Sequence, residues 1–420
     1  MADTANTAAR ETAAPSMPRL SQQAGFWVVA CSFFVVTAFS TAPSSLYGLF
    51  AKDLSLSPLT VTVVYAVYAV GLVVSLLLAG HLSDLHGRRT VLLPAIGLAI
   101  GAAVLFLVWR TLPGLLVARL LTGAAIGAAV ATATAYITDL DGGPGRRAAI
   151  VGTVANIGGL AIGPLIAGCL ARYAPHPLTL PFDVFVVALG IAFLVLIVVP
   201  EGHPGTWPRP RYRPQRLTVP AHAREQFVAA LAGTFLCFAV FGLFAGLAGR
   251  FLVEPLGHPS PALSGLAIFL TFAAGITVQV TTIDVPAQRL IARGIAPALV
   301  GLAILVLSAW TSPPSLTLFL IGGLVAGAGG GAIFRGSLSV VIETSRQHER
   351  AGALTTFFVA GYAGISLPVL GLGVALEVLS ARVTLLVFGL VVGLGLLLAA
   401  PLLVRRPDQR SQRHGDASST

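Results

Sequence analysis

The sequence predicts an all-α polytopic membrane protein with twelve transmembrane helices, arranged as two pseudo-symmetric six-helix bundles. Three observations support this fold class: the composition, the number of long apolar runs and an internal repeat. Of the 420 residues, 56% are hydrophobic and only 10% are charged, whereas a soluble domain carries roughly 25% charged residues. A spanning helix needs about 20 apolar residues, so the chain has room for about a dozen spans. A soluble fold is therefore excluded.

Twelve apolar runs of at least 17 residues, bounded by charges, glycine or proline, are the predicted helices. They cover residues 26–50, 58–80, 90–109, 114–138, 147–171, 181–199, 226–252, 262–283, 295–311, 315–342, 351–376 and 383–404. The first run is too long for the apolar part of a signal peptide and lacks a clear cleavage motif. We therefore expect it to remain as the first membrane helix.

These runs divide the chain into five segments. They are a disordered cytoplasmic N-terminus at 1–24, an N-terminal bundle at 25–200, a linker at 201–224, a C-terminal bundle at 225–404 and a cytoplasmic tail at 405–420. The linker is the one long polar segment between runs, and it holds five prolines and five arginines. This composition is typical of a flexible connection between two domains.

The basic residues predict the orientation in the membrane. Nineteen arginines lie in segments on the side of both termini, five lysine or arginine residues lie on the opposite side, and Arg119 and Arg335 lie within helices. Because cytoplasmic loops carry the excess of positive charge, both termini are expected in the cytoplasm. The expected location of the protein is the plasma (inner) membrane. The net charge of +10 is then an orientation signal, and nucleic acid is not an expected partner.

The two halves repeat with an offset of 204 residues. The segment Gly97-Leu98-Ala99-Ile100 recurs as Gly301-Leu302-Ala303-Ile304. The same offset relates Gly123 to Gly327, Gly127 to Gly331, Asp139 to Glu343, Arg146 to Arg350 and Pro164 to Pro368. A constant offset that aligns an acid, an arginine and a proline predicts two homologous bundles around a shared cavity.

A charged loop follows the second predicted helix and reads Gly80-His81-Leu82-Ser83-Asp84-Leu85-His86-Gly87-Arg88-Arg89. Gly80 permits close helix packing, Gly87 permits a tight turn, and Arg88 can bridge carboxylates. The loop resembles the signature loop of the major facilitator superfamily, G-x-L-x-D-x-x-G-R-R/K, at the place where that family carries it.

The resemblance implies a conformational latch in this loop. Its members would be Gly80, Asp84, Gly87, Arg88, Arg89 and Asp139. In the outward-open state Asp84 would face the start of the eleventh helix near Ala351, and Arg88 would face Asp139. A plain positive-inside loop is the alternative, but it leaves Asp84 and the glycines unexplained.

Arg119, Gly123 and Gly127 in the fourth predicted helix are four residues apart and share one face. They are similar to the family's R-x-x-x-G-x-x-x-G pattern. A charge at the centre of a membrane helix costs about 2.5 to 3.5 kcal/mol on insertion scales, which favours a role for Arg119 in substrate binding or proton coupling. The alternative is that Arg119 lies close enough to the helix end to extend to the outer interface.

The fifth predicted helix contains Gly159, Gly163, Pro164 and Gly168. This resembles the G-x-x-x-G-P-x-x-G-G element of proton-linked antiporter branches of the superfamily, with Ala167 at the place of one glycine. Proline removes a backbone hydrogen bond and glycines let a helix bend and pack, so the four residues are a predicted hinge. Glycine pairs at this spacing are also common packing patterns.

Further polar side chains could bind substrate or a coupling proton. Arg335 either holds a substrate anion or pairs with a carbonyl or carboxylate across helices. Asp183 is the acid that could face the cavity, although a satisfied interface position is the alternative. Amide and aromatic candidates for the cavity wall are Asn156, Gln279, Tyr362, Tyr65, Tyr68, Tyr136, Phe357 and Phe358.

The resemblance implies a secondary active transporter that alternates between inward and outward openings, with proton-coupled efflux of a small organic or drug-like compound. The alternative is a transporter of a small organic anion bound by Arg119 and Arg335, and a remote alternative is a non-transporting membrane receptor. The sequence contains no zinc-protease, serine-hydrolase or P-loop motif, so we expect no enzyme and no cofactor or metal. The expected partners are a small-molecule substrate, the lipid bilayer and a coupling proton. We expect the protein to be a monomer.

Overall fold

The structure is a computed structural model that describes residues 20–79, 82–201 and 217–404. The predicted tail lies outside the described residues, as do most of the predicted N-terminus and linker, and so does Gly80. All regular secondary structure in the described part of the chain is helical.

The first half of the chain forms six membrane elements. They are α1 (Gln22–Thr41), continued by the 3-10 helix η1 (Ala42–Leu46) and α2 (Tyr47–Asp53); α3 (Pro58–Ala79); α5 (Arg88–Val108); α6 (Leu112–Leu140); α7 (Arg146–Thr153), continued by the π-helical turn η2 (Val154–Gly158) and α8 (Gly159–Tyr173); and α9 (Leu180–Leu196). A short helix that the sequence pattern did not predict, α4 (Leu82–His86), connects α3 to α5.

The second half forms six more elements after the 3-10 turn η3 (Ala221–Ala223). They are α10 (Arg224–Val253), α11 (Pro261–Thr281), α12 (Ala287–Trp310), α13 (Leu316–Thr344), α14 (Arg350–Val378) and α15 (Ala381–Val404). In the described residues, 11 elements are long and apolar enough to cross a membrane, and α9 is a shorter apolar helix. The predicted twelve-helix fold is confirmed.

Two predicted helices are interrupted. The first, predicted over 26–50, changes from α to 3-10 geometry at Ala42, because Pro43 at the start of the 3-10 helix has no backbone N–H to donate. The fifth, predicted over 147–171, contains the π-helical turn at Val154–Gly158. Single π turns occur frequently at functional sites.

Two helices begin a full turn or more earlier than predicted. α12 begins at Ala287 rather than at residue 295, and its first turns carry the exposed Arg289 and Arg293. Likewise α1 begins at Gln22, with Ser21 as its N-cap, instead of at residue 26. Apolar runs identify the part of a helix that lies in the hydrocarbon, whereas these helices continue into the polar region.

The two halves repeat one packing arrangement, in which a glycine-bearing helix lies directly against the backbone of its neighbour. α6 packs on α3 in this way, and α13 packs on α11. A side chain would overlap a backbone carbonyl at Gly123 (Tyr68), Gly127 (Leu72), Gly327 (Thr271) and Gly331 (Gly275). The glycines keep the offset of 204 residues, so the sequence repeat corresponds to a repeated helix pair.

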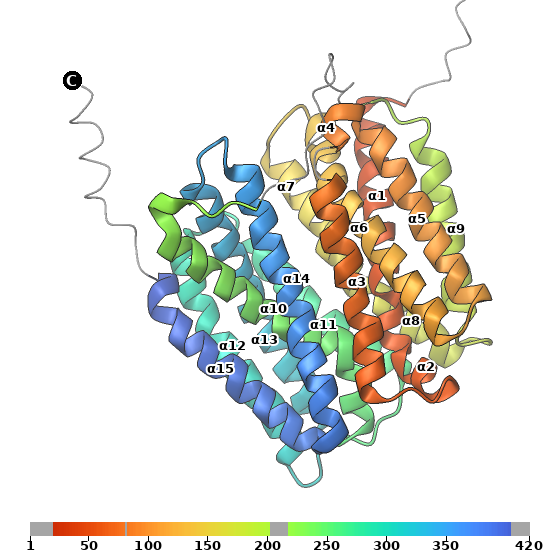
Figure 1. Ribbon diagram of the computed structural model, residues 1–420, viewed down its shortest axis with the longest axis vertical. Helices are drawn as coiled ribbons and strands as arrows, with labels where there is room; N and C mark the ends of the chain where they lie inside the picture. Colours follow the sequence, from red (N-terminus) through yellow and green to blue (C-terminus); the bar gives the residue numbers. More distant parts are fainter. Residues whose placement is uncertain (1–19, 80–81, 202–216, 405–420) are drawn as a thin grey trace, which may run out of the picture.

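The halves meet along two helix pairs, α3 with α14 and α8 with α11 (Figure 1). We call the end of the molecule that holds Gln22 and Val404 the termini end, and the opposite end the far end. Close approaches between halves lie toward the far end, where Gly373 lies against Thr62 and Gly168 against the Pro261 carbonyl. In Figure 1 the two halves come together at the bottom, which is the far end.

Candidate functional site

Arg119 is buried inside the first half, with an exposed fraction of 1%. It lies two turns into α6, and its Nη1 donates a hydrogen bond to the Ser40 carbonyl at 2.8 Å. Ser40 lies directly before α1 changes into η1, so an irregular turn presents this carbonyl to the interior. The alternative that Arg119 extends to the outer interface is wrong.

Three tyrosine rings surround the Arg119 guanidinium. The guanidinium carbon lies 4.5 Å from the ring centroid of Tyr68, 5.9 Å from that of Tyr65 and 6.0 Å from that of Tyr47. We call these four residues the arginine nest. Cation–π attraction holds the charge over the rings, but Arg119 Nε has no hydrogen-bond partner in the described part of the chain. The Nε–H donor of the nest is therefore unsatisfied within the described residues.

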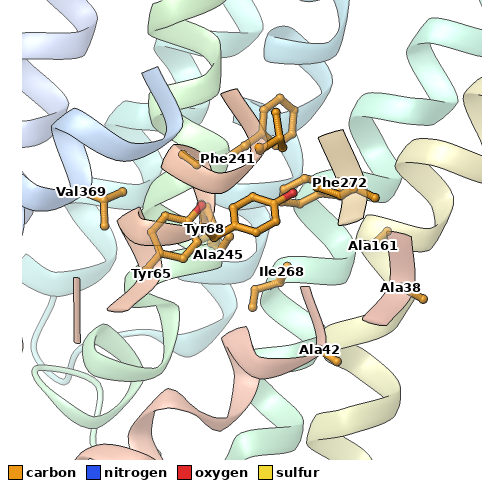
Figure 2. Close-up of a cluster of buried hydrophobic side chains, with 14 of the residues drawn as sticks. Ala38, Ala42, Tyr65, Tyr68, Ala161, Phe241, Ala245, Ile268, Phe272 and Val369 are labelled. Atoms are coloured by element: carbon orange, nitrogen blue, oxygen red, sulfur yellow. The ribbon is translucent and has the colours of Figure 1, made fainter. Parts of the chain in front are cut away.

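Tyr65 and Tyr68 also belong to a buried cluster at the boundary between the halves (Figure 2). The members of this central cluster are Ala38, Ala42, Tyr65, Tyr68, Ala161, Phe241, Ala245, Ile268, Phe272 and Val369. The ring centroids of Phe241 and Phe272 are 4.8 Å apart. A side chain at Gly246 would lie 3.2 Å from the Tyr65 ring, so α10 approaches this ring closely. The arginine nest thus touches the second half through a tyrosine.

Aromatic side chains continue from the central cluster through the second half toward the termini end. The members of this aromatic path are Phe238, Phe241, Phe334, Phe357, Phe358 and Tyr362. The centroid of the Phe238 ring lies 6.2 Å from that of Phe241, 5.2 Å from that of Phe334 and 6.2 Å from that of Tyr362. Phe238, Phe358 and Tyr362 are only half-buried. The path therefore presents aromatic rings at an accessible surface.

The sequence pattern predicted part of this surface and missed the rest. It named Tyr65, Tyr68, Phe357, Phe358 and Tyr362 as cavity candidates, but the other members of the aromatic path and Tyr47 are new. A phenylalanine in a membrane helix is equally compatible with a lipid contact, which is why the pattern alone does not select it. The available signal is the three-residue spacing that places two rings on one helix face, as in Phe238 and Phe241.

The predicted hinge residues lie where α8 contacts α1 and α11. The close approaches are Gly159 to the Thr37 side chain, Gly163 to the Ala38 carbonyl, Gly168 to the Pro261 carbonyl and the Pro164 carbonyl to Gly265. The π turn that precedes Gly159 is held by Thr37, whose Oγ1 donates to the Ala155 carbonyl at 2.8 Å. Asn156 lies in this turn and is half-buried. The segment thus combines an irregular helix with contacts to both halves.

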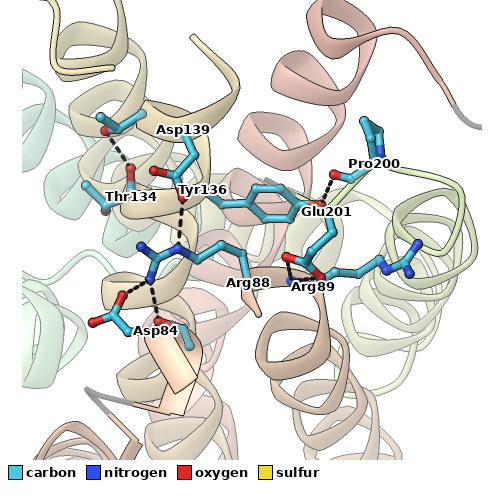
Figure 3. A network of polar contacts seen from close by, with 10 residues as sticks. Asp84, Arg88, Arg89, Thr134, Tyr136, Asp139, Pro200 and Glu201 are labelled. Atoms are coloured by element: carbon cyan, nitrogen blue, oxygen red, sulfur yellow. Dashed lines mark hydrogen bonds and ion pairs between the residues drawn. The ribbon is translucent and has the colours of Figure 1, made fainter. Parts of the chain in front are cut away.

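The described members of the predicted latch form a network at the termini end of the first half (Figure 3). Arg88 Nε donates to Asp139 Oδ2 at 2.9 Å, and Arg88 Nη1 bonds Asp84 and donates to Ser83 Oγ at 2.9 Å. Gly87 has a φ of 97°, in the left-handed region that favours glycine. These contacts join α4, α5 and α6, all within the first half.

Arg89 contacts a different part of the chain. Its backbone N–H donates to the Glu201 carboxylate at 3.1 and 3.2 Å, and its Nη1 donates to the Ile197 and Val199 carbonyls. Tyr136, expected as a cavity residue, donates its hydroxyl to the Pro200 carbonyl at 2.7 Å. Both side chains therefore fasten the segment after α9 to the bundle (Figure 3).

The remaining predicted residues are dispersed. Arg335 Nη2 donates to the Ile283 carbonyl at 2.9 Å, just after α11 ends, which is the carbonyl pairing among its two alternatives. Gln279 is buried in the last turns of α11. Asp183 is exposed in the first turn of α9 at the far end, away from the central cluster. Within the described ranges, no group of three His, Cys, Asp or Glu side chains could hold a metal ion.

The sequence matches one protein-family model and the multidrug resistance protein MdtL of two Escherichia species. The family model described as Major Facilitator Superfamily matches residues 28–313. The multidrug resistance protein MdtL of Escherichia coli (strain UTI89 / UPEC) is 27% identical over 265 residues, 60% of this chain and 64% of that protein. MdtL of Escherichia fergusonii is 27% identical over 267 residues, with the same coverage. The chain thus spans less than two thirds of the length of these curated relatives.

Solved structures match over most of the chain. A crystal structure of the nucleoside transporter NupG has a TM-score of 0.71 at 12% identity and covers 91% of this chain and 100% of that one. The peptide transporter POT in complex with sulfate has a TM-score of 0.72 at 11% identity and covers 90% and 93%. At these identities the likeness shows the fold alone. With the family model matching well over half of its residues, this multi-pass membrane protein belongs to the major facilitator superfamily of transporters and not to an enzyme family.

Proposed function

We propose that this transporter exports small amphipathic organic compounds with aromatic or other apolar groups, in exchange for protons. The two halves would rock so that a site between them opens first to one side of the membrane and then to the other. Both termini would lie in the cytoplasm, since the termini end carries most of the basic residues.

The aromatic path is the observation that carries this proposal. Half-buried rings such as Phe238 and Tyr362 form an apolar surface that stacks on aromatic groups and attracts cations. Apolar contact depends little on the position of individual atoms, so it tolerates substrates of different shape. The relatives named as multidrug resistance proteins support the same class of substrate.

The arginine nest supplies the polar contact of the proposed site. Arg119 Nε is a buried charged donor without a partner among the described residues, and leaving such a donor unpaired costs roughly 1 to 3 kcal/mol or more. A carbonyl, ether or carboxylate oxygen of a bound compound would recover this free energy. One precise polar contact in a mostly apolar site is the usual arrangement of small-molecule pockets.

The geometry argues against one organic anion bound by both Arg119 and Arg335. Arg119 lies seven residues into α6, and Arg335 lies nineteen residues into α13, the equivalent helix of the other half. At 1.5 Å per residue their depths differ by about 18 Å. Arg335 also already donates to Ile283. An organic-anion site would therefore rest on Arg119 alone.

Proteoliposomes with an imposed pH gradient test the proposal. We expect gradient-driven movement of amphipathic cations and neutral aromatic compounds, and several-fold higher KM values for Phe238→Ala and Tyr362→Ala. Phe193→Ala is the matched control, because Phe193 is half-buried on α9, outside the aromatic path. Transport of organic anions only would contradict the proposal. So would transport of the test compounds at a rate that does not depend on the pH gradient.

A further inference from the structure

A groove lies between α12 and α15, on the side of the second half turned away from the first half (Figure 1). Its volume is about 520 Å³, and its lining is almost entirely apolar. Gly389 and Gly393 form part of its wall. An added Cβ at Gly393 would be in ordinary contact with Leu299 at 3.7 Å, whereas at Gly389 it would lie 2.6 Å from Val306, so α12 packs closely on α15 at Gly389. Leu390 and Leu394 are exposed beside them. The groove therefore faces the hydrocarbon of the bilayer.

The groove has the length of one leaflet. It runs from Leu299 to Trp310 on α12 and from Leu397 to Leu386 on α15. Eleven helical steps correspond to about 17 Å, close to half of the roughly 30 Å hydrocarbon core. It ends at the far end, where Trp310 is exposed. Tryptophan at a helix end is typical of the membrane–water interface.

A positive charge lies at the far-end opening of the groove. Arg382 precedes Leu386 by four residues and therefore shares its face of α15. Its side chain is exposed and makes no ion pair or hydrogen bond within residues 20–79, 82–201 and 217–404. It lies in the first turn of α15, where the helix dipole adds to the positive potential.

We propose that this groove binds a phospholipid with an anionic headgroup from the far leaflet. One acyl chain lies between α12 and α15 against Gly389 and Gly393, and the phosphate pairs with Arg382. Charge complementarity selects this occupant over a second copy of the chain, since a two-fold contact through the groove brings two Arg382 side chains to the same face. Lipid binding here is independent of what the central site transports.

Native mass spectrometry of the full chain, released from nanodiscs with equal phosphatidylglycerol and phosphatidylcholine, tests the proposal. The wild-type protein is expected to retain one phosphatidylglycerol molecule in preference to phosphatidylcholine. Arg382→Gln is expected to weaken its retention about fivefold, the effect of one basic residue at a membrane surface. Gly393→Leu fills the groove and is expected to release both lipids. Ala303→Leu fills the groove from α12, and it replaces Gly393→Leu in this test if that variant does not fold.

Two matched variants change the same residue types elsewhere. Arg172→Gln removes an exposed far-end arginine on α8, and Gly101→Leu adds a side chain at a glycine on α5 with no atom within 4 Å. Both are expected to retain lipid as the wild type does. Wild-type retention by Arg382→Gln or by both filling variants would overturn the proposal. So would a wild-type dimer that Gly393→Leu abolishes, because the occupant would then be a second copy.

Discussion

At the scale of the residue, Arg119 differs from its counterpart in the repeat. The offset of 204 residues relates it to Gly323 of α13. There a side chain would lie 2.5 Å from the Phe244 ring, so the second half fills the equivalent space with an aromatic side chain. Both halves adopt the same fold, yet only one of these two positions carries a charge. The repeated helix pair thus forms in the second half without a charge at this position, which favours a functional role for Arg119.

We expect Arg119→Met to keep most of its stability and to lose transport. A buried cation carries a desolvation cost that methionine avoids, while the Ser40 carbonyl loses a hydrogen bond worth about 1 kcal/mol. Thermal denaturation should shift by no more than about 4 °C. Transport should fall roughly tenfold or more, the value of a charged hydrogen bond. A large loss of stability would instead assign Arg119 to folding.

Glu377 connects the two halves at the far end. Its Oε1 accepts a hydrogen bond from the Leu59 N–H at 3.0 Å, in the first turn of α3, where negative charge is favourable. Glu377→Ala should open the far end more often. The measurement is the labelling rate of Thr62→Cys by a membrane-impermeant maleimide, since Thr62 is fully buried here. We expect a several-fold faster rate.

The control for this measurement is Glu254→Ala. Glu254 also lies at the far end, but it pairs with Arg250 at the end of α10, in its own half. Its removal should leave the labelling of Thr62→Cys unchanged. Equal rates in the two glutamate variants would show that Glu377 does not hold the halves together.

At the scale of the element, close packing of α6 on α3 positions the arginine nest. We expect Gly123→Ala to destabilise the protein by about 1–3 kcal/mol, the usual cost of overpacking, because its methyl group overlaps the Tyr68 carbonyl. It should also lower transport, since Tyr68 moves away from Arg119. Gly101→Ala is the control, because no atom lies within 4 Å of its added methyl group. Equal melting temperatures for the two variants would contradict this account.

The sequence predicts the elements well because a bilayer restricts them. A spanning segment must satisfy its own backbone hydrogen bonds, so long apolar runs become helices. The same pattern could not predict where helices change geometry. A proline such as Pro43 is tolerated within many membrane helices, and the π turn at Val154–Gly158 is held by Thr37 from another helix. In the first turns of α12 the exposed Arg289 and Arg293 interrupt the apolar run, so the pattern places the helix start too late.

Contacts between distant segments limit what could be predicted of the site. The signature loop pointed to Arg88 and Asp139, which do bond. It gave no sign that Arg89 binds Glu201, 112 residues away. The three-tyrosine surround of Arg119 likewise comes from α2 and α3, and only the fold brings these rings together.

At the scale of the whole molecule, the contacts between halves are unequal at the two ends. The far end has interlocked helices, with Gly373 against Thr62 and Gly265 against the Pro164 carbonyl. At the termini end Arg146 and Asp284 form an ion pair at 3.6 Å with both side chains exposed, and such pairs contribute little. This distribution favours a state that opens toward the termini end.

A cross-link between Thr62→Cys and Gly373→Cys should trap this state and stop transport. A Cβ atom at residue 373 would lie 3.0 Å from that of Thr62, so a small helix movement reaches the roughly 3.5–4.5 Å of a disulfide. The variants should be made in a protein in which the native cysteines Cys31, Cys169 and Cys237 are replaced by serine. Oxidation should abolish transport and reduction should restore it, while Thr62→Cys alone responds to neither. Full transport by the oxidised, cross-linked protein would show that the far end need not open, and rocking of the two halves would be rejected.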